Sequence, residues 1–160
     1  MITFVLQRNK KLKHRKENNM NYTSIEQSRK LLELGLDPKT SDCNWQHAPG
    51  YENDEGKITG FWNDPEWGQS GDSKDLPCWS LGALLELMPP YLFEFERGID
   101  LNIYRNLNGK GWHVSYMPNN TESLLKDRFR QINNGKTPIE AAYNMVVWLL
   151  ENGYIKAEKK

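Results

Sequence analysis

The chain has 160 residues, of which 38% are hydrophobic and 26% are charged, and its formal net charge is zero. This length suits one folded domain with a sizeable core, and no apolar run approaches the ~20 residues that a membrane-spanning helix needs. The charge is uneven: residues 1–19 hold six bases and one acid, so residues 20–160 keep 15 bases against 20 acids, a balance of −5. This acidic body argues against nucleic acid as a partner, because phosphate binding needs clustered Lys and Arg.

Residues 1–19 form a basic leader ahead of Met20. Their apolar residues precede their bases, which is the reverse of the order in a secretory signal. We predict that this leader is disordered and that Met20 is the native start, because a capped helix begins directly after it. A basic arm that binds RNA, DNA or an anionic membrane is the alternative. At the other end, the charged residues 156–160 are predicted to form a frayed tail.

The first predicted element is a helix over residues 24–34. Thr23 and Glu26 have the spacing of a capping box, in which two side chains satisfy free backbone N–H groups of the first turn. Apolar residues recur inside this segment at helical spacing. Gly35 then supplies the left-handed cap, and Pro38 prevents continuation of the helix.

A long loop follows from Thr40 to Pro77, where periodicity is lost. Pro, Gly, Asn, Asp and Ser dominate this segment, yet several aromatic residues are embedded in it. Because disordered segments are poor in aromatic residues, we expect an ordered loop with one or two short strands. Trp45 and residues 58–62 are the best strand candidates.

A short apolar helix comes next, and both of its ends are marked in the sequence. Ser80 is the predicted N-cap, because its hydroxyl can accept a hydrogen bond from a free N–H in the first turn. Four apolar side chains follow at helical spacing: Leu81, Leu84, Leu85 and Met88. Pro89 and Pro90 prevent continuation.

From residue 91 the apolar period changes to two, which predicts an antiparallel meander of about three strands. The strands cover residues 91–96, 99–104 and 112–116, and turn residues occupy 106–111. In the first strand, Leu92, Glu94 and Glu96 alternate with three aromatic residues. We expect the side that carries the two glutamates to face solvent.

Two more helices are predicted towards the C-terminus. The first covers residues 121–132 and ends at Asn133–Gly135. The second begins at Thr137, where a capping box with Glu140 is combined with proline at the first helical position, and it ends at Gly153. Residues 20–155 are therefore predicted to form a single α+β domain, with a small antiparallel β-meander, three to four helices and one long aromatic loop.

Three stretches together resemble a family of small uncharacterised proteins: residues 77–89, the hairpin that carries Trp112, and residues 141–153. This family occurs in gut Bacteroides-type bacteria, often in prophage or mobile-element neighbourhoods. The resemblance covers about residues 20–155 and also favours Met20 as the start. Its motifs are structural in type, so it implies a genomic setting but neither an activity nor a site.

Four side chains have the chemistry of zinc ligands: Cys43, His47, Cys78 and His113. Only Cys43 and His47 are close in sequence, whereas a zinc signature shows two close pairs, so we predict no metal and no cofactor. Cys78 lies near a helix N-terminus, which favours a thiolate, and could act with His113 and Asp100 as in a cysteine hydrolase. No local signature of such an enzyme is present, so we predict no catalytic residue. Two ordinary thiols also fit the reducing cytoplasm, where we expect the protein.

The best candidate for a binding site is an aromatic and acidic cluster in the long loop, formed by Phe61, Trp62, Asp64, Glu66 and Trp67. Aromatic faces beside carboxylates suit sugar rings, cationic groups or the basic side chains of a protein partner. The alternative is that these aromatic residues fold back over the sheet and give the loop its own core.

We therefore predict a non-enzymatic protein-interaction module, in a prophage setting if the resemblance holds, that binds an unknown protein partner through residues 60–67. The alternative is a small-molecule-binding protein or an enzyme with a pocket between the long loop and the sheet. Cys78, His113 or Tyr104 would serve that pocket. Nucleic-acid binding would require residues 8–16 to be part of the native protein.

Overall fold

The computed structural model of the chain describes residues 21–53, 60–62, 65–69, 71–94, 97–118 and 131–157. Its α-helices are α2 (Ile25–Glu33), α3 (Leu81–Glu86) and α5 (Pro138–Glu151), and η1 (Pro38–Thr40) is a 3-10 turn. Its strands are β1 (Cys43–Trp45), β2 (Glu66–Trp67), β3 (Leu76–Cys78), β4 (Tyr91–Glu94), β5 (Arg97–Arg105), β6 (Trp112–Pro118) and β7 (Gln131–Gly135). These elements of the described residues confirm the predicted α+β class. The predicted leader, residues 1–19, lies outside them.

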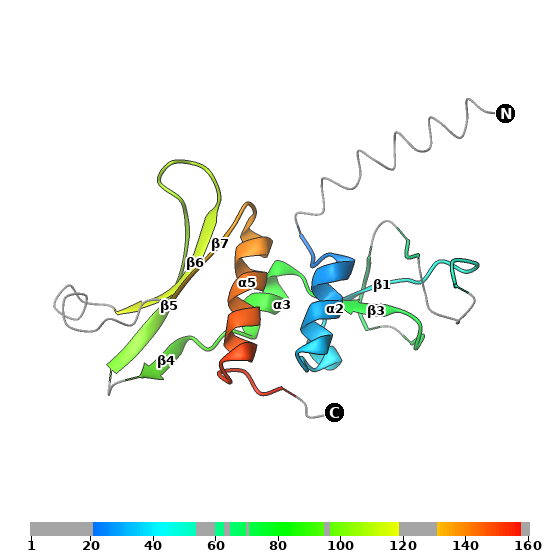
Figure 1. Cartoon of the computed structure of the whole chain (residues 1–160), viewed down its shortest axis with the longest axis horizontal. Helices are drawn as coiled ribbons and strands as arrows, with labels where there is room; N and C mark the ends of the chain where they lie inside the picture. Colours follow the sequence, from blue (N-terminus) through cyan, green and yellow to red (C-terminus); the bar gives the residue numbers. More distant parts are fainter. Residues whose placement is uncertain are drawn as a thin grey trace.

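The strands form two separate antiparallel sheets. The small sheet has the strand order β2-β1-β3, and the large sheet has the order β4-β5-β6-β7. Figure 1 shows the two sheets towards opposite ends of the molecule, with the helices between them. Helix α5 packs against β6, β7 and α3, and helix α2 packs against β3. Each sheet therefore has a helix of its own to cover its apolar face.

Helix α2 forms where it was predicted, but its N-cap differs. The hydroxyl of Ser24 accepts the N–H of Gln27 at 3.2 Å, and the Gln27 side chain accepts the N–H of Ser24 at 2.9 Å. The predicted capping box of Thr23 and Glu26 is therefore wrong. Thr23 is fully buried, and its hydroxyl oxygen accepts the N–H of Trp79 at 3.0 Å instead. A tertiary contact has thus taken the hydroxyl that local spacing assigned to the cap.

The helix ends predicted at Ser80, Thr137, Gly35 and Gly153 are confirmed. Ser80 accepts the N–H of Ala83 in α3, and Thr137 accepts the N–H of Glu140 in α5, which has proline at its first position. Gly35 and Gly153 end their helices with φ angles of 87° and 76°, the left-handed conformation that glycine adopts without steric cost. In the capping box of Thr137 and Glu140, the Thr137 hydroxyl accepts the N–H of Glu140 as expected. The Glu140 carboxylate accepts the N–H of Lys136 in place of the N–H of Thr137.

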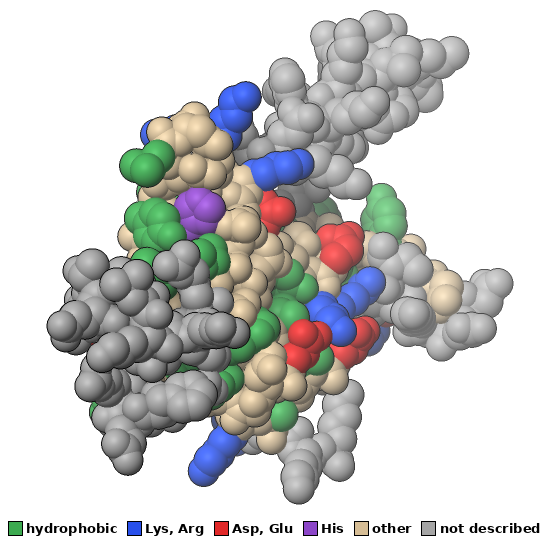
Figure 2. All heavy atoms as spheres, turned by 60° about the vertical axis from the view of Figure 1, so that its left-hand side comes forward, with side chains coloured by type: hydrophobic (Ala, Val, Ile, Leu, Met, Phe, Trp, Pro, Cys, Tyr) green, Lys and Arg blue, Asp and Glu red, His purple; other side chains and the backbone are tan. Residues whose placement is uncertain are grey.

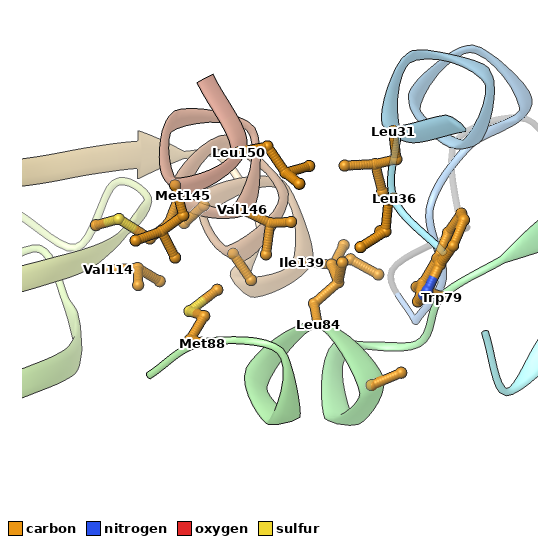
Figure 3. Close-up of a cluster of buried hydrophobic side chains, with 14 of the residues drawn as sticks. Leu31, Leu36, Trp79, Leu84, Met88, Val114, Ile139, Met145, Val146 and Leu150 are labelled. Carbon is orange, nitrogen blue, oxygen red and sulfur yellow. The ribbon is translucent and has the colours of Figure 1, made fainter. Parts of the chain in front are cut away.

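The main core joins α5, α3, the inner side of α2 and the large sheet. Figure 3 shows Val146 and Ile139 of α5 directed towards Leu84 of α3, with Leu31 and Trp79 on the α2 side. All five side chains are at most 3% exposed. Since burying one such side chain contributes about 1.5–3 kcal/mol, this cluster dominates the hydrophobic stabilisation of the fold.

A smaller core lies between the small sheet and α2. Cys43, Trp45, Leu76 and Cys78 form it, and they alternate along β1 and β3 as the inward side of a sheet should. The indole N–H of Trp45 donates to the carbonyl of Thr23 at 3.1 Å, which fastens the sheet to the start of α2.

The predicted helix over residues 121–132 is wrong at its C-terminal end. Residues 131–135 form β7, which pairs with β6, whereas residues 121–130 lie outside the described residues. The expected helix stop at Asn133–Gly135 is therefore part of a strand. Gly135 is needed there, because a Cβ on it would lie 2.2 Å from the backbone nitrogen of Ala141 in α5. The close approach of α5 to β7 therefore requires glycine at position 135.

The meander formed as predicted over its described residues. In its first strand, Leu92 is 3% exposed and Tyr91 is 46% exposed, whereas the side chains of Glu94 and Glu96, which were expected to face solvent, lie outside what the structure describes. Leu92 faces inwards because its side of the sheet carries the core residues Val114 and Tyr116. The Tyr116 hydroxyl also donates to the carbonyl of Pro89 at 2.6 Å, just ahead of β4.

The long loop contains the small sheet. The predicted strand at Trp45 is confirmed as β1, whereas residues 58 and 59 of the second candidate lie outside the described residues. Phe61 of that candidate forms a single bridge to His47. Strand β3 was not predicted, because it contains Pro77. Proline is tolerated there since β3 lies at a sheet edge.

Candidate functional site

The predicted binding residues lie along the outer edge of the small sheet. The N–H of Trp62 donates to the carbonyl of Gln46 at 2.9 Å, and the N–H of Gly68 donates to the carbonyl of Asp42 at 2.8 Å. Between these points, Glu66 and Trp67 pair with Asn44 and Cys43 as β2. Residues 61–62 and 66–68 therefore follow β1 on the side away from β3 and lie at the edge of the sheet.

The structure does not bury the two loop tryptophans. Trp62 is 54% exposed and Trp67 is 66% exposed, so they do not fold back to make a core. Trp67 contacts Tyr22 edge-to-face, with 5.2 Å between ring centroids. Tyr51, beside Gly60 in space, adds a third exposed ring at 63%. Three large rings thus remain accessible at one end of the molecule.

Phe61 has a different role from these rings. It is half-buried against the small core, and the Arg29 guanidinium lies 5.7 Å from its ring centroid. This packing anchors the edge segment to α2. Phe61 therefore supports the binding surface more than it forms it.

Glu66, the one described acidic member of the predicted cluster, lies on a different face of the sheet from Trp67. Glu66 is exposed and lies opposite Asn44, whereas Trp67 lies opposite Cys43, so their side chains leave opposite faces of the sheet. Asp64 lies outside the described residues. We call the exposed or half-exposed members of this region the aromatic edge: Tyr51, Phe61, Trp62, Glu66 and Trp67.

A hollow of about 490 Å³ lies next to the small sheet. Its lining includes Asn44 of β1, Pro77 of β3, Ser41, and the loop residues Gln69, Asp72 and Asp75. Asn44 is only 5% exposed, and its side-chain oxygen has no hydrogen-bond partner among the described residues. Buried polar atoms almost always have a partner, so this oxygen is an exception, and less than 1 Å² of it is open to solvent.

Three titratable side chains meet at the margin of this hollow. His47 Nδ1 lies 3.5 Å from Asp72 Oδ2 and 3.4 Å from Asp75 Oδ1. We call these three residues the His47 cluster. Sequence reasoning paired His47 with Cys43 and missed both aspartates. The spacing of three residues between Asp72 and Asp75 could have indicated that one turn brings the two carboxylates together. Nothing in the sequence indicates that the loop returns them to His47.

The two cysteines come together, but as buried thiols. Cys43 and Cys78 are opposite each other in β1 and β3, with 2.8 Å between the sulfur atoms, and the Cys43 thiol contacts the Cys78 carbonyl at 3.1 Å. The hydrogen bond with Cys43 and then burial raise the pKa of the Cys78 thiol. The expected lowering of this pKa by a helix N-terminus is therefore wrong, because Cys78 precedes the N-cap of α3 and lies inside a sheet.

His113 does not join either cysteine. It lies on β6 in the large sheet, where its ring stacks on Tyr104 with centroids 5.1 Å apart. Asp100 lies opposite Met117 near the other end of that strand pair. The set of Cys78, His113 and Asp100 therefore does not assemble, and neither Cys78, His113 nor Tyr104 lines the hollow.

Charged side chains are distributed over the visible surface. Figure 2 shows Lys and Arg side chains at separate places, several of them beside Asp or Glu, on the described part of one face. Among the described residues, no helix is both long and apolar enough to cross a bilayer. No protein-family model, curated protein or solved structure matches the chain.

Proposed function

We propose that this chain is a protein-interaction module that binds its partner through the aromatic edge. The exposure of Trp62 and Trp67 is the observation that carries this proposal. Exposed indoles leave apolar area in contact with water, and a partner that covers them recovers about 25 cal/mol for each Å². Trp is also the residue type most enriched among the side chains that dominate binding energy.

The backbone of this region supports the same role. Among the described residues, Glu66 and Trp67 pair with β1 on one side, and β2 is the last strand of the small sheet. An edge strand presents free N–H and C=O groups that an extended segment of another chain can pair with. Rings and backbone together thus offer both apolar and directional contacts.

Charge favours a basic partner segment. Residues 20–160 carry five more acids than bases, and Glu66 is exposed on the edge strand itself. Lys and Arg side chains can stack on exposed indole faces and pair with such a carboxylate. A cytoplasmic setting, which belongs to this proposal, suits the two free thiols.

The experiment is affinity capture from source-cell lysate with the full chain and with a Trp62→Ser/Trp67→Ser variant. We expect the variant to lose the captured protein, because truncating a central Trp costs about 2 kcal/mol or more, roughly a 30-fold rise in Kd. Binding of the isolated partner should also weaken between 0.1 and 1 M salt, because ions screen the contacts to basic side chains.

Leu107→Ser is the matched control, since Leu107 is fully exposed but lies on the β5–β6 turn of the large sheet. It removes an exposed apolar group without touching the aromatic edge, and thermal unfolding verifies that both variants fold. A partner retained equally by all three proteins contradicts the proposal. So does a full chain that captures no protein above a blank matrix.

The alternative, a small-molecule site between the long loop and the sheet, is supported by the hollow at Asn44. We rank the aromatic edge first because its rings are the more exposed, with Trp62 at 54% and Trp67 at 66%. Tyr91, Ile103 and Tyr104 on the large sheet are less exposed, at 46%, 41% and 37%. They are the less favoured surface for the same partner.

A further inference from the structure

We propose that His47, Asp72 and Asp75 form a binding site for one divalent first-row transition-metal ion. This inference goes beyond the proposed interaction function and does not depend on it. The site uses the end of the small sheet and the loop that precedes β3.

The spacing of the three side chains fits a shared ion. One ligand atom from each residue lies within 4.8 Å of the other two, and His47 Nδ1 is 3.4 and 3.5 Å from the carboxylate oxygens. Nitrogen and oxygen ligands at about 2.0–2.2 Å from a metal lie roughly 3–3.5 Å from one another. A direct charged hydrogen bond would be shorter, about 2.7–2.9 Å. The observed distances therefore match ligands around a common centre better than a tight ion pair.

Backbone groups hold both carboxylates in place. Asp75 Oδ1 accepts the N–H of His47 at 2.9 Å, and Asp72 Oδ1 accepts the N–H of Lys74 at 2.9 Å. Such second contacts orient metal ligands and strengthen metal affinity. The Lys74 ammonium itself donates to Glu52 at 2.8 Å. The local turn thus directs two acids towards His47 while its lysine bonds a third acid.

Burial makes the cluster more than a solvated acidic surface. The side chains of His47 and Asp75 are 16% and 8% exposed, whereas that of Asp72 is 50% exposed. Charges attract more strongly where water is partly excluded. The half-exposed Asp72 leaves a path by which an ion can enter from solvent.

The hollow gives the ion room for further ligands. Asp72 and Asp75 both line it. An ion with three protein ligands keeps water at its remaining positions, and the hollow offers space for that water.

The donor set selects the class of ion. One imidazole nitrogen and two carboxylates suit Zn²⁺, Mn²⁺ or a similar ion. Ca²⁺ takes six to eight oxygen ligands, and Mg²⁺ is bound through carboxylates and waters, so neither requires the imidazole. We expect Zn²⁺ and Mn²⁺ to bind in preference to Ca²⁺ and Mg²⁺.

The test is isothermal titration of the untagged full chain with ZnCl₂ and MnCl₂, beside Asp72→Asn and His47→Gln variants. Asp72→Asn removes a charge from a half-exposed residue but keeps an oxygen for the Lys74 N–H, so this variant should fold. We expect one ion per chain and a loss of at least about tenfold in affinity in each variant, since even indirect ligand contacts contribute that much. His113→Gln, which changes a histidine of the large sheet, should bind as the parent does.

A second measurement locates the ion without mutation. Substoichiometric Mn²⁺ should broaden the NMR signals of the backbone amides of His47 and Asp75 and leave that of Tyr116 sharp. Broadening elsewhere, or Zn²⁺ affinity that survives both cluster variants, would overturn the proposal. Loss of Zn²⁺ binding in Cys43→Ser/Cys78→Ser alone would assign the ion to the thiols and overturn it as well. A parent chain that binds neither ion also refutes it.

Discussion

The two ends of this molecule divide stability and candidate function between them. Among the described residues, the main core around α5 has sixteen buried side chains, whereas the core of the small sheet has four. The small sheet nevertheless carries the aromatic edge, the hollow and the His47 cluster. A region with little buried apolar surface can expose rings and position charges, because the larger core keeps the chain folded.

The largest effect should come from a cavity in the main core. Leu149→Ala in α5 removes a fully buried side chain and should lower the free energy of unfolding by about 2–5 kcal/mol. Leu76→Ala in the small core should cost less, because fewer side chains surround it. Urea denaturation measures both, with the fully exposed Leu107→Ala as a control expected within about 0.5 kcal/mol. Equal losses for Leu149→Ala and Leu76→Ala would remove the distinction between the two cores.

An intermediate effect is expected at Tyr116 in the large sheet. Burial raises the pKa of Tyr116 above its ordinary value of 10.0, and its hydroxyl donates to Pro89. The folded chain therefore holds this proton more tightly than the unfolded chain, so the stabilisation is complete below pH 10 and is lost as the pH rises above it. Tyr116→Phe should cost about 1–2 kcal/mol at pH 7.

The pH dependence distinguishes this explanation from simple packing. The difference in unfolding free energy between the parent and Tyr116→Phe should shrink from pH 9 to pH 11, because only the parent has the Tyr116 proton to lose. Denaturation at each pH measures it. A difference that stays constant over this range would mean that titration of Tyr116 does not contribute to stability.

The smallest effect should come from the exposed pair of Glu52 and Lys74 at the small-sheet end. The hydrogen bond from Lys74 lowers the pKa of Glu52 below 4.5, so any stabilisation is present above pH 4.5 and is lost as the pH falls through the folded-state pKa. In Lys74→Met, NMR titration should show the pKa of Glu52 returning towards 4.5. Stability at pH 7 should change little, since exposed ion pairs contribute little. An unchanged Glu52 pKa would show that the pair does not persist in solution.

Local chemistry made much of this fold predictable. Ser80, Thr137, Gly35 and Gly153 mark helix ends through contacts within a few residues, and these assignments hold. The failures involve contacts distant in sequence. Thr23 lost its predicted role as a cap to a bond with Trp79, and residues 131–135 became a strand only because β6 was available beside them.

The candidate site was predictable only in part, for the same reason. Composition locates the tryptophans of the polar loop but leaves open whether they are exposed or fold back over the sheet, and the structure shows them exposed along one sheet edge. That Glu66 and Trp67 face opposite sides depends on the pairing of β2 with β1, which composition does not encode. The His47 cluster joins His47 to two aspartates that lie 25 or more positions further along the chain. The loop between them has no periodic sequence, so no local pattern predicts that they meet.

The cysteine pair allows opening of the small sheet to be counted one molecule at a time. Both thiols are fully buried in the small core, on the side of β1 and β3 that faces α2, so an alkylating reagent reaches them only when this core opens. Once one sulfur is alkylated, the added group has no space in the closed core, and the second sulfur stays accessible. Intact-mass spectra during labelling should therefore contain chains with no adduct and chains with two. The rate at which the unlabelled chains disappear equals the rate of productive opening at the end of the molecule that carries the aromatic edge.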